Sequence, residues 1–342
     1  MKPQRFLAVA ALCLALLFAG YFALFMYQLG APVDGEWWVD DVFRYRKLRA
    51  ENLQSPKIII AAGSNGLFGI NSRVLEQKTG LPVLNLSGHA ELDLDYSFFQ
   101  IRKFMGNEDI VVLPLEFEYY SRDGTITDWF SSNMMAWGPE YLAGLPAREF
   151  FKFFTAAQPA RVLEGVLAKI SADRPKATAV RDMVATLEKL LTSEGTAWRG
   201  YSYTSLNRYG EINVDGNPSL TGSMNYGLDA GVRLSDHFLE VYGKIKKFVQ
   251  EKQGVLILTW PVTMKNPLFD FSDPESLAGL HRLEHQLRAH GITLQCKGAA
   301  FNLDRRYFLD TPYHTNRQGA LIRSQRLADC LVGRIIVGNG DI

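Results

Sequence analysis

The chain begins with a long apolar run that carries no charged residue. This run extends over 23 residues, from Phe6 to Gln28. A helix rises about 1.5 Å per residue, so the run measures roughly 34 Å, whereas the hydrocarbon core of a bilayer is about 30 Å thick. The sequence therefore predicts one N-terminal transmembrane helix, in which residues 1–28 form a membrane anchor.

The charges that flank the apolar run predict its orientation. Lys2 and Arg5 precede it, and acidic residues follow it from Asp34 onward. Because basic flanks remain in the cytoplasm, we expect a single pass through the cytoplasmic (inner) membrane, with the rest of the chain in the periplasm or another extracytoplasmic space. A cleaved signal peptide is the alternative, but its apolar region has only about 7–15 residues and ends at a small-residue site. Here Ala19 and Gly20 lie among bulky side chains, which favours an uncleaved anchor.

The remaining composition is that of a globular domain without a charge excess. The 342 residues include 37 Lys and Arg and 36 Asp and Glu, for a formal net charge of +1. This balance argues against a protein that binds nucleic acid through a basic surface. Outside the anchor the sequence contains two cysteines, Cys296 and Cys330. They either pair, as cysteines do in an oxidising compartment, or remain separate buried thiols.

Strand-like and helix-like segments alternate along most of the chain. Short apolar runs typical of buried strands occupy residues 57–62, 82–86, 109–115, 254–260 and 291–295. Segments with helical spacing occupy residues 65–79, with Gly80 expected to close the helix, 92–105, 235–253, 274–290 and 316–332. This alternation predicts an α/β fold with a mostly parallel sheet and helices on both faces. In such sheets ligands bind at the carboxyl ends of the strands.

The alternation stops between residues 121 and 234. A polar, aromatic loop is followed by a helical section from Pro146 to about Ser193 and by a Gly/Asn/Tyr-rich segment from Gly200 to Gly231. We interpret residues 121–234 as an insertion between residues 29–120 and 235–342, the two parts of the α/β domain. Long loops at the active edge of a sheet usually carry substrate contacts. The insertion is either such a cover or a purely structural cap.

Three residues at predicted strand ends have the chemistry of a serine hydrolase. Ser64 follows the first strand, and Asp310 and His314 lie on one loop before the last helix. A serine becomes a nucleophile when a histidine takes its proton, and a carboxylate orients that histidine. Backbone N–H groups at the strand-to-helix turn can stabilise an oxyanion. A serine at this place is also a common helix N-cap. The prediction of a catalytic site therefore depends on Ser64, Asp310 and His314 together.

These segments resemble the conserved blocks of the SGNH, or GDSL-like, hydrolase superfamily. Residues 62–66, Ala-Gly-Ser-Asn-Gly, resemble the nucleophile block, and residues 85–88, Asn-Leu-Ser-Gly, the block whose glycine helps to form the oxyanion hole. Residues 308–316, followed by Gly319, resemble the final Asp/His block. The resemblance covers residues 55–120 and 235–335. It implies an SGNH-like, flavodoxin-like sheet, catalysis by Ser64, Asp310 and His314, and an oxyanion hole formed by the N–H groups of Ser64 and Gly88.

The sequence lacks one motif of the SGNH superfamily and the nucleophile motif of a competing fold. The Gly-x-Asn-Asp block of the superfamily does not occur, because the third strand runs into Pro-Leu-Glu-Phe-Glu-Tyr at residues 114–119. The competing α/β-hydrolase fold requires Gly-x-Ser-x-Gly, and Ala62 stands in place of its first glycine.

The anchor, the outward domain and the Asp-Thr-Pro-Tyr-His form together resemble a narrower group. These are accessory proteins of cell-envelope acylation: the alginate and cellulose acetylation proteins and the D-alanyl-lipoteichoic acid protein. The resemblance implies a polytopic membrane-bound O-acyltransferase as partner and transfer of an acyl group, through an acyl-serine, to an envelope polysaccharide or related polymer. Attack by water instead makes the same site an esterase. A non-catalytic scaffold or polymer-binding protein with the same fold is the alternative.

Further polar and aromatic residues follow the predicted strands. The candidates for lining the substrate site are Asn65, His89, Glu116, Glu118 and Trp260. Glu116 and Glu118 alternate at a strand end and are expected on one face, as a polar wall or as paired acids. His89 equally suits a local hydrogen bond, and Trp260 either stacks on a sugar or belongs to the core. His281 and His285 have the spacing of two metal ligands, but with no third ligand evident we expect neither a metal nor another cofactor.

Overall fold

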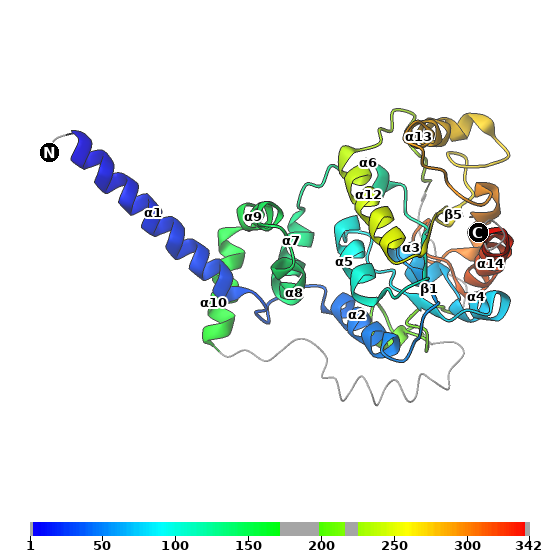
Figure 1. Ribbon diagram of the computed structural model, residues 1–342, viewed down its shortest axis with the longest axis horizontal. Coiled ribbons are helices and arrows are strands. Elements are labelled where there is room, and N and C mark those ends of the chain that lie inside the picture. The colour runs from blue at the N-terminus through cyan, green and yellow to red at the C-terminus, as the bar shows by residue number, and fades with distance from the viewer. Residues whose placement is uncertain (1–2, 172–197, 216–224, 339–342) are drawn as a thin grey trace. The chain divides into compact units, whose positions relative to one another are not determined.

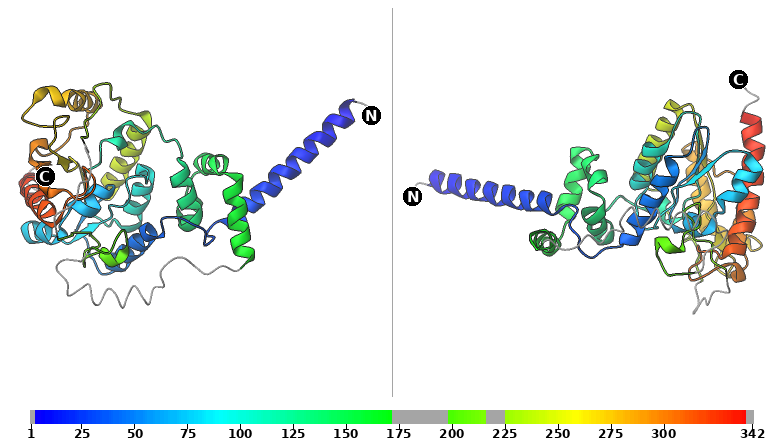
Figure 2. Two further views of the ribbon diagram at one scale, coloured as in Figure 1. Left: turned by 180° about the vertical axis from the view of Figure 1, so that it is seen from behind. Right: turned by 90° about the horizontal axis from the view of Figure 1, so that it is seen from below.

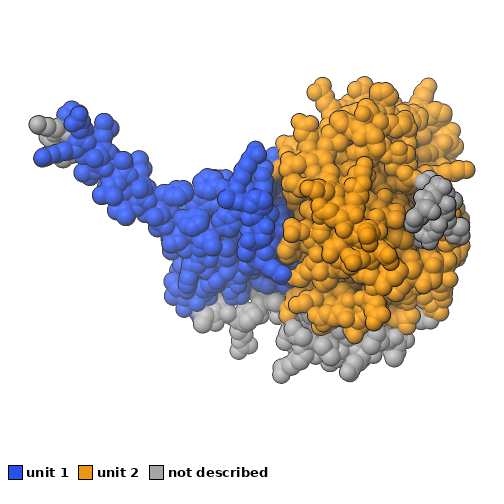
Figure 3. Space-filling view, viewed as in Figure 1, with its two compact units in different colours: residues 1–40, 125–178 blue, residues 41–124, 179–342 orange. Residues whose placement is uncertain are grey.

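The computed structural model describes residues 3–171, 198–215 and 225–338, and it divides the chain into two compact units (Figures 1 and 3). Unit 1 comprises residues 1–40 and 125–178, and unit 2 comprises residues 41–124 and 179–342. The first part of the predicted insertion therefore groups with the predicted anchor, and its later part groups with the sheet. The predicted helical section beyond residue 171, and residues 216–224, lie outside the described residues.

Unit 2 is built on a parallel sheet. Its strands are β1 (Ile58–Ile60), β2 (Val83–Asn85), β3 (Ile110–Leu113) and β4 (Val255–Leu258), in the order β2-β1-β3-β4. The first three are buried along their whole length, as the apolar runs predict for strands covered on both faces. All four strands were expected from the sequence, and the prediction of an α/β fold with a parallel sheet is confirmed.

The fifth predicted strand, residues 291–295, is wrong. Within the described residues, the sheet continues beyond β4 as a single isolated parallel bridge between Thr259 and Gln295. The next residue, Cys296, has a φ of 69°, which is incompatible with an extended strand. The chain therefore leaves the sheet where the strand was expected to form.

Helices cover both faces of this sheet (Figure 2). On one face α4 (Ser72–Thr79) packs against α14 (Arg317–Gly338), and on the other α5 (Leu94–Phe104) packs against α12 (Asp236–Glu251). The helix predicted over residues 65–79 is two helices, α3 (Ser64–Gly69) and α4, because Ile70 is extended and the Asn71 side chain caps α4. Gly80 closes α4 with a φ of 73°, as expected.

Three further helices, a small second sheet and several 3-10 helices complete the described elements outside the N-terminal helical unit. They are α2 (Trp37–Ala50), α6 (Glu118–Ser121), α13 (Ala278–Ala289), a two-stranded sheet of β5 (Thr263–Met264) and β6 (Asn302–Leu303), and the 3-10 helices η1 (Tyr203–Ser205), η2 (Pro274–Leu277), η3 (Gly298–Phe301) and η4 (Arg305–Tyr307). Cys296 and Cys330 form a disulfide across 34 residues of sequence. Of the two possibilities left open by the sequence, the structure has the paired one, which ties α14 to the segment after α13.

Unit 1 is helical. Its first helix, α1 (Pro3–Gln28), is long and apolar enough to cross a membrane, with a mean hydropathy of 2.5 over its best window. No residue of that window is buried within the protein. The other helices are α7 (Asp128–Trp137), α8 (Pro139–Ala143), α9 (Ala147–Ala156) and α10 (Pro159–Ile170), of which α10 packs against α1.

Candidate active site

Ser64 lies where the strand order of the sheet reverses. It is the first residue of α3, directly after β1, and β1 lies between β2 and β3. Chain connections leave the carboxyl ends of two adjacent strands in opposite directions at such a point, which opens a crevice where ligands of α/β sheets bind. The side chain of Ser64 is partly exposed, whereas the five residues that follow it are buried.

A buried carboxylate holds the turn that carries Ser64. Glu116 is 1% exposed, and its two oxygens accept the backbone N–H groups of Gly63 at 3.0 Å and of Asn65 at 2.9 Å. A Cβ on Gly63 would lie 2.5 Å from Glu116 Oε1 and 2.9 Å from Ala90 Cα, so the turn needs glycine there. Glu116 therefore clamps the turn on both sides of Ser64.

The predicted placement of Glu116 and Glu118 on one strand face is wrong. Strand β3 ends at Leu113, Glu116 lies in the following loop, and Glu118 begins α6. Glu118 accepts a hydrogen bond from the Tyr313 hydroxyl at 3.3 Å. Burial, together with the nearby charge of Glu116, raises the pKa of Glu118. The two acids thus have different surroundings and different hydrogen-bond partners.

Asn65 is a structural residue of the turn. Its side chain is fully buried, its amide nitrogen donates to Pro114 O at 2.9 Å, and its Oδ1 accepts from Arg323 Nη2 at 2.6 Å. Arg323, on α14, also donates to the Asn65 carbonyl at 2.7 Å. Burial lowers the pKa of Arg323 to about 9, against the opposing effect of Glu116. Asn65, expected to line the substrate site, instead connects the turn to α14.

Asp310 and His314 face each other across their loop. Asp310 Oδ1 lies 2.8 Å from His314 Nδ1. The loop folds back because the His314 N–H donates to Thr311 Oγ1 at 3.0 Å and the Leu309 N–H donates to His314 O at 2.8 Å. An imidazole has two ring nitrogens, and each can form a hydrogen bond. Because Asp310 bonds to Nδ1, Nε2 is left for a second partner.

A tyrosine from the predicted insertion completes the environment of Asp310. The Tyr201 hydroxyl donates to Asp310 Oδ2 at 2.5 Å. Burial raises the pKa of Asp310, but the hydrogen bond and charge of His314 and the Tyr201 hydroxyl outweigh it and lower this pKa to about 2. Asp310 is therefore a carboxylate at neutral pH, as the orienting acid of a triad must be.

His314 is packed onto the helix that begins with Ser64. The His314 ring stacks on the buried Phe68 ring with centroids 4.1 Å apart and an interplanar angle of 11°. Thr315 Oγ1 also donates to Phe68 O at 3.1 Å. Phe68 lies one turn after Ser64 on α3, and side chains four apart on a helix share a face, with Cβ atoms about 5–6 Å apart. Within the described residues, no hydrogen bond joins Ser64 and His314.

Two aromatic side chains contact the His314 ring, and a third packs against both of them. Besides the Phe68 stack, the ring of Tyr201 lies 6.3 Å from His314 and 6.0 Å from Phe68, and that of Trp198 lies 5.3 Å from Tyr201. We call Phe68, Trp198 and Tyr201 the aromatic cluster. Sequence reasoning did not identify these residues individually. The available signal was the aromatic, glycine-rich composition of the insertion around residue 200.

The prediction that the Gly88 N–H points into an oxyanion hole is wrong. This N–H donates to Ala62 O at 2.9 Å, and two residues earlier the Leu86 N–H donates to Ile60 O at 2.7 Å. The ladder between β1 and β2 thus continues past the last assigned strand residues and uses the Gly88 donor. The Ser64 N–H, at the free end of α3, has no acceptor among the residues that the structure describes.

The two remaining candidates for lining the substrate site, His89 and Trp260, form hydrogen bonds with residues other than Asp310 and His314. His89 Nδ1 accepts the Glu91 N–H at 3.1 Å, which is the local role that the sequence left open. Trp260 is buried in the main core and donates to Cys296 O at 3.3 Å. Of its two sequence interpretations, the core position is the one observed.

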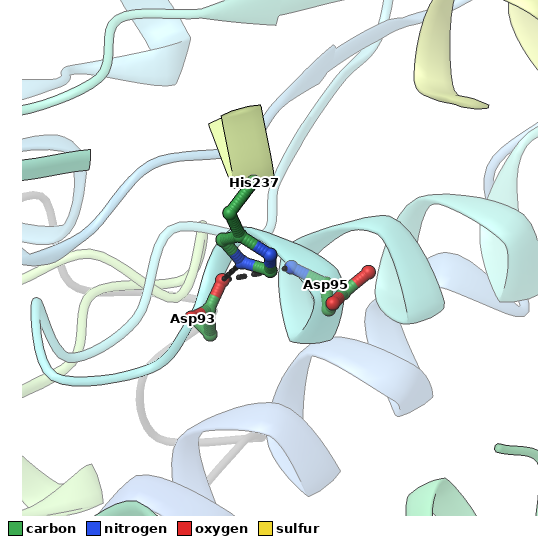
Figure 4. A group of neighbouring side chains, drawn as sticks. All are labelled: Asp93, Asp95 and His237. Carbon is green, nitrogen blue, oxygen red and sulfur yellow. Dashed lines mark hydrogen bonds and ion pairs between the residues drawn. The ribbon is translucent and has the colours of Figure 1, made fainter. Parts of the chain in front are cut away.

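A second Asp–His group lies at the start of α5 (Figure 4). Ligand atoms of Asp93, Asp95 and His237 lie within 4.8 Å of one another. Asp93 Oδ1 caps α5 by accepting the Asp95 N–H at 3.4 Å and lies 2.9 Å from His237 Nε2. Asp93 therefore acts as the N-cap of α5, and its contact with His237 connects this cap to α12. His281 and His285 are exposed on α13.

A cavity of about 220 Å³ is lined by arginines. Arg73, Arg208 and Arg317 contribute to its wall, together with Tyr209 and with amide and apolar side chains. Arg317 is the first residue of α14, three positions after His314, and its guanidinium also pairs with Asp215 at 2.8 Å. The cavity wall therefore carries planar, cationic guanidinium groups, a side-chain type that binds carboxylate and phosphate groups.

A scan of protein-family models and a search of curated proteins found no match to this chain. The chemistry of the site therefore has to be inferred from its geometry. That geometry combines a partly exposed serine at a clamped strand-to-helix turn, an ionised Asp310 bonded to His314, and the aromatic cluster that packs the imidazole onto the serine's helix.

Proposed function

We propose that this protein is a serine-dependent O-acyltransferase, or an esterase acting through the same residues. Ser64 is the nucleophile, His314 the general base and Asp310 the orienting carboxylate. The observation that carries the proposal is the 2.8 Å contact between Asp310 and His314 on a loop that stacks His314 against Phe68, one helical turn from Ser64. An Asp–His pair next to the helix that carries a serine can activate that serine as a nucleophile.

The reaction follows from these positions. His314 Nε2 removes the Ser64 proton as Oγ attacks the acyl carbonyl, and Asp310 stabilises the imidazolium that forms. The imidazolium then protonates the leaving alcohol, and the acyl group remains on Ser64. An acceptor hydroxyl, deprotonated by the same histidine, attacks the acyl-serine, which yields the new ester and restores Ser64. Water in place of the acceptor gives the free acid.

The backbone N–H of Ser64 is a donor of the oxyanion hole. The Ser64 N–H lies at the N-terminus of α3, where free N–H groups and the helix dipole favour a negative charge. Each donor of an oxyanion hole contributes roughly 10²–10³ in kcat. Because the Gly88 N–H is used in the sheet, the Ser64 N–H is the one oxyanion donor that this proposal assigns.

The compartment and partners form part of the same proposal. Helix α1 anchors the chain in the cytoplasmic membrane, and unit 2 lies on the extracytoplasmic side. The disulfide between Cys296 and Cys330 supports this placement, because disulfides persist mainly in oxidising compartments. The strand order β2-β1-β3-β4 agrees with the flavodoxin-like sheet that the SGNH-like resemblance implies. A polytopic membrane-bound O-acyltransferase supplies the acyl group.

The acceptor is an anionic envelope polysaccharide or related polymer. The arginine-lined cavity supports this choice, since guanidinium groups bind carboxylates and phosphates through paired, charge-assisted hydrogen bonds. A neutral glucan lacks the anionic groups that pair with guanidinium groups through charge-assisted hydrogen bonds.

A non-catalytic scaffold in an envelope acylation complex is the second candidate. Two observations favour it: Ser64 has no hydrogen bond to His314 in the described residues, and the Gly88 N–H is occupied. Catalytic hydrogen bonds are often long in the absence of substrate, so the first observation is compatible with both functions.

Labelling with a fluorophosphonate probe separates the two functions. A catalytic Ser64 reacts with the probe, and tryptic mass spectrometry then finds the adduct on Ser64. Ser64→Ala should lose the label, whereas Ser121→Ala, at an exposed helix end, should keep it. An unlabelled but natively folded wild-type protein, or equal labelling of Ser64→Ala, would reject the enzyme and leave the scaffold.

A further inference from the structure

Helix α10 is apolar on two faces. The inner face, with Val162, Gly165 and Val166, is buried, and a Cβ on Gly165 would lie 2.7 Å from Gln28 Oε1 of α1. The outer face presents Leu163, Leu167 and Ile170, which are 56%, 53% and 68% exposed. Spacings of four and three residues place these side chains in one stripe. A helix that faces water has a polar outer face, so this stripe needs a different explanation.

Helix α9 brings further apolar surface to the same place. Phe154 of α9 contacts Phe22 and Phe25 of α1, with ring centroids 5.4 Å and 5.2 Å apart. Phe18 of α1 contacts Phe151, at 6.3 Å between centroids. Phe151 is nevertheless 46% exposed. Helices α9 and α10 thus both pack against the C-terminal half of α1, where Figure 1 shows them. Both keep large apolar side chains exposed.

The depth of these contacts follows from the proposed anchor. The uncharged run begins at Phe6, and Phe18 lies twelve residues further on, about 18 Å along a helix. The hydrocarbon core is about 30 Å thick. When Phe6 enters the core on the cytoplasmic side, Phe18 is still inside the outer leaflet, and so is the part of α9 that contacts it.

Lys169 marks the level at which α1 leaves the membrane. Its ammonium group donates to Tyr27 O at 2.7 Å and Leu29 O at 2.6 Å and lies 5.4 Å from the centre of the Tyr27 ring. A lysine on the last carbonyls of a helix and a tyrosine beside it are typical of the interface between lipid and water. Helix α10, which carries Lys169, therefore lies at that interface.

We propose that α9 and α10 form a collar around the outer end of α1 that inserts into the outer leaflet, with Phe151, Leu163, Leu167 and Ile170 in contact with lipid. This inference rests on the anchoring part of the proposed function. The occupant is lipid because the stripe continues the surface of α1, whose membrane-spanning window has no protein cover.

Fluorescence quenching in pure lipid tests the collar. The full-length protein is reconstituted without other proteins in vesicles of phosphatidylcholine and phosphatidylglycerol that contain brominated acyl chains. An environment-sensitive NBD label is placed on Leu167→Cys or Phe151→Cys, each in a Cys13→Ser background. Both labels should emit at shorter wavelength and lose at least half of their intensity to the quencher. The matched control is Lys247→Cys, 80% exposed on α12 of unit 2, which should not be quenched.

The native Cys13 separates failure of the collar from failure of the anchor. Cys13 is a free, exposed thiol in α1, so a label on it reports whether α1 is in the bilayer. Quenching at Cys13 without quenching at residues 151 and 167 would overturn the collar and leave the anchor. That result would point to a protein partner on the stripe. Absence of quenching at residues 13, 151 and 167 would overturn both the collar and the membrane anchor.

Discussion

The imidazole of His314 stacks on the ring of Phe68 at 4.1 Å between centroids. This contact joins two parts of the chain that lie more than two hundred residues apart, the first strand-to-helix turn and the loop before the last helix. It packs the His314 ring onto the helix whose first residue is Ser64, and Asp310 Oδ1 lies 2.8 Å from Nδ1 of the same ring. Replacing any member of this arrangement has a defined consequence.

Ser64→Ala and His314→Ala should abolish acyl-ester turnover. In a well-studied serine protease, loss of the serine or the histidine lowers kcat by about a million-fold. Asp310→Asn should impair turnover less, by about 10⁴-fold, because the asparagine keeps the geometry but favours the wrong tautomer of the imidazole. Hydrolysis of a chromogenic acyl ester measures the rates, and circular dichroism checks the fold. Ser64 is partly exposed, so Ser64→Ala should change the free energy of unfolding by less than about 0.5 kcal/mol. Wild-type turnover by Ser64→Ala would contradict the triad.

Tyr201→Phe should raise the pKa of Asp310 above its present value of about 2, because the hydroxyl that stabilises the carboxylate is removed. Carbon-13 NMR of the Asp310 carboxyl group, followed from pH 7 to pH 1.5, measures the shift. Tyr203→Phe, two residues away on η1, is the matched control and should leave the titration unchanged. An unaltered midpoint in Tyr201→Phe would show that Tyr201 does not act on the dyad.

The Asp310 carboxylate should make folding stability depend on pH in the acid range. Its pKa in the folded protein, about 2, is below the ordinary value of about 3.9. The stabilisation it provides is therefore fully present above pH 5 and is lost as the pH falls toward 2. Urea unfolding of wild type and Asp310→Asn should differ at pH 6 and converge near pH 2. A difference that persists unchanged at pH 2 would have another origin.

Glu116→Gln should destabilise unit 2 strongly, whereas Glu118→Gln should have little effect. Glu116 accepts two backbone N–H groups in a buried site, and the glutamine NH₂ group would face one of them. Losing one such charged bond and leaving an N–H unpaired costs about 3 kcal/mol. Burial already favours the neutral form of Glu118 by raising its pKa, so glutamine suits that site. Chemical denaturation compares the two, and equal losses would refute the clamp.

Arg317→Ala and Arg208→Ala should weaken binding of an anionic oligosaccharide by roughly tenfold each. A hydrogen bond to a charged group contributes about 1.5–3 kcal/mol, and every 1.4 kcal/mol is about tenfold in affinity. Isothermal calorimetry with an oligouronate measures the effect, which should diminish as salt increases. Lys244→Ala, on α12, is the control. Equal binding of a neutral glucan would reject the anionic acceptor.

Local sequence signals predicted much of the fold. The uncharged run predicted α1, β-branched runs predicted β1 to β4, and Gly80 predicted the end of α4. The Asp310–His314 pair was also predictable, because both residues lie on one short loop that brings them together. In each case the residues involved are near neighbours in the chain, so spacing and composition suffice to anticipate the geometry.

The rest of the site depends on contacts between distant residues. Glu116 and Gly63 are 53 residues apart, Tyr201 and Asp310 are 109 apart, and Arg323 and Asn65 are 258 apart. The pairing of β1 with β2 likewise takes the Gly88 N–H that a local motif assigned to the oxyanion. The sequence by itself determined the four strands of the main sheet, the long apolar helix α1 and the local contact between Asp310 and His314. Only the tertiary structure decided which polar groups remain available, because each buried donor and acceptor must find its partner in the folded chain.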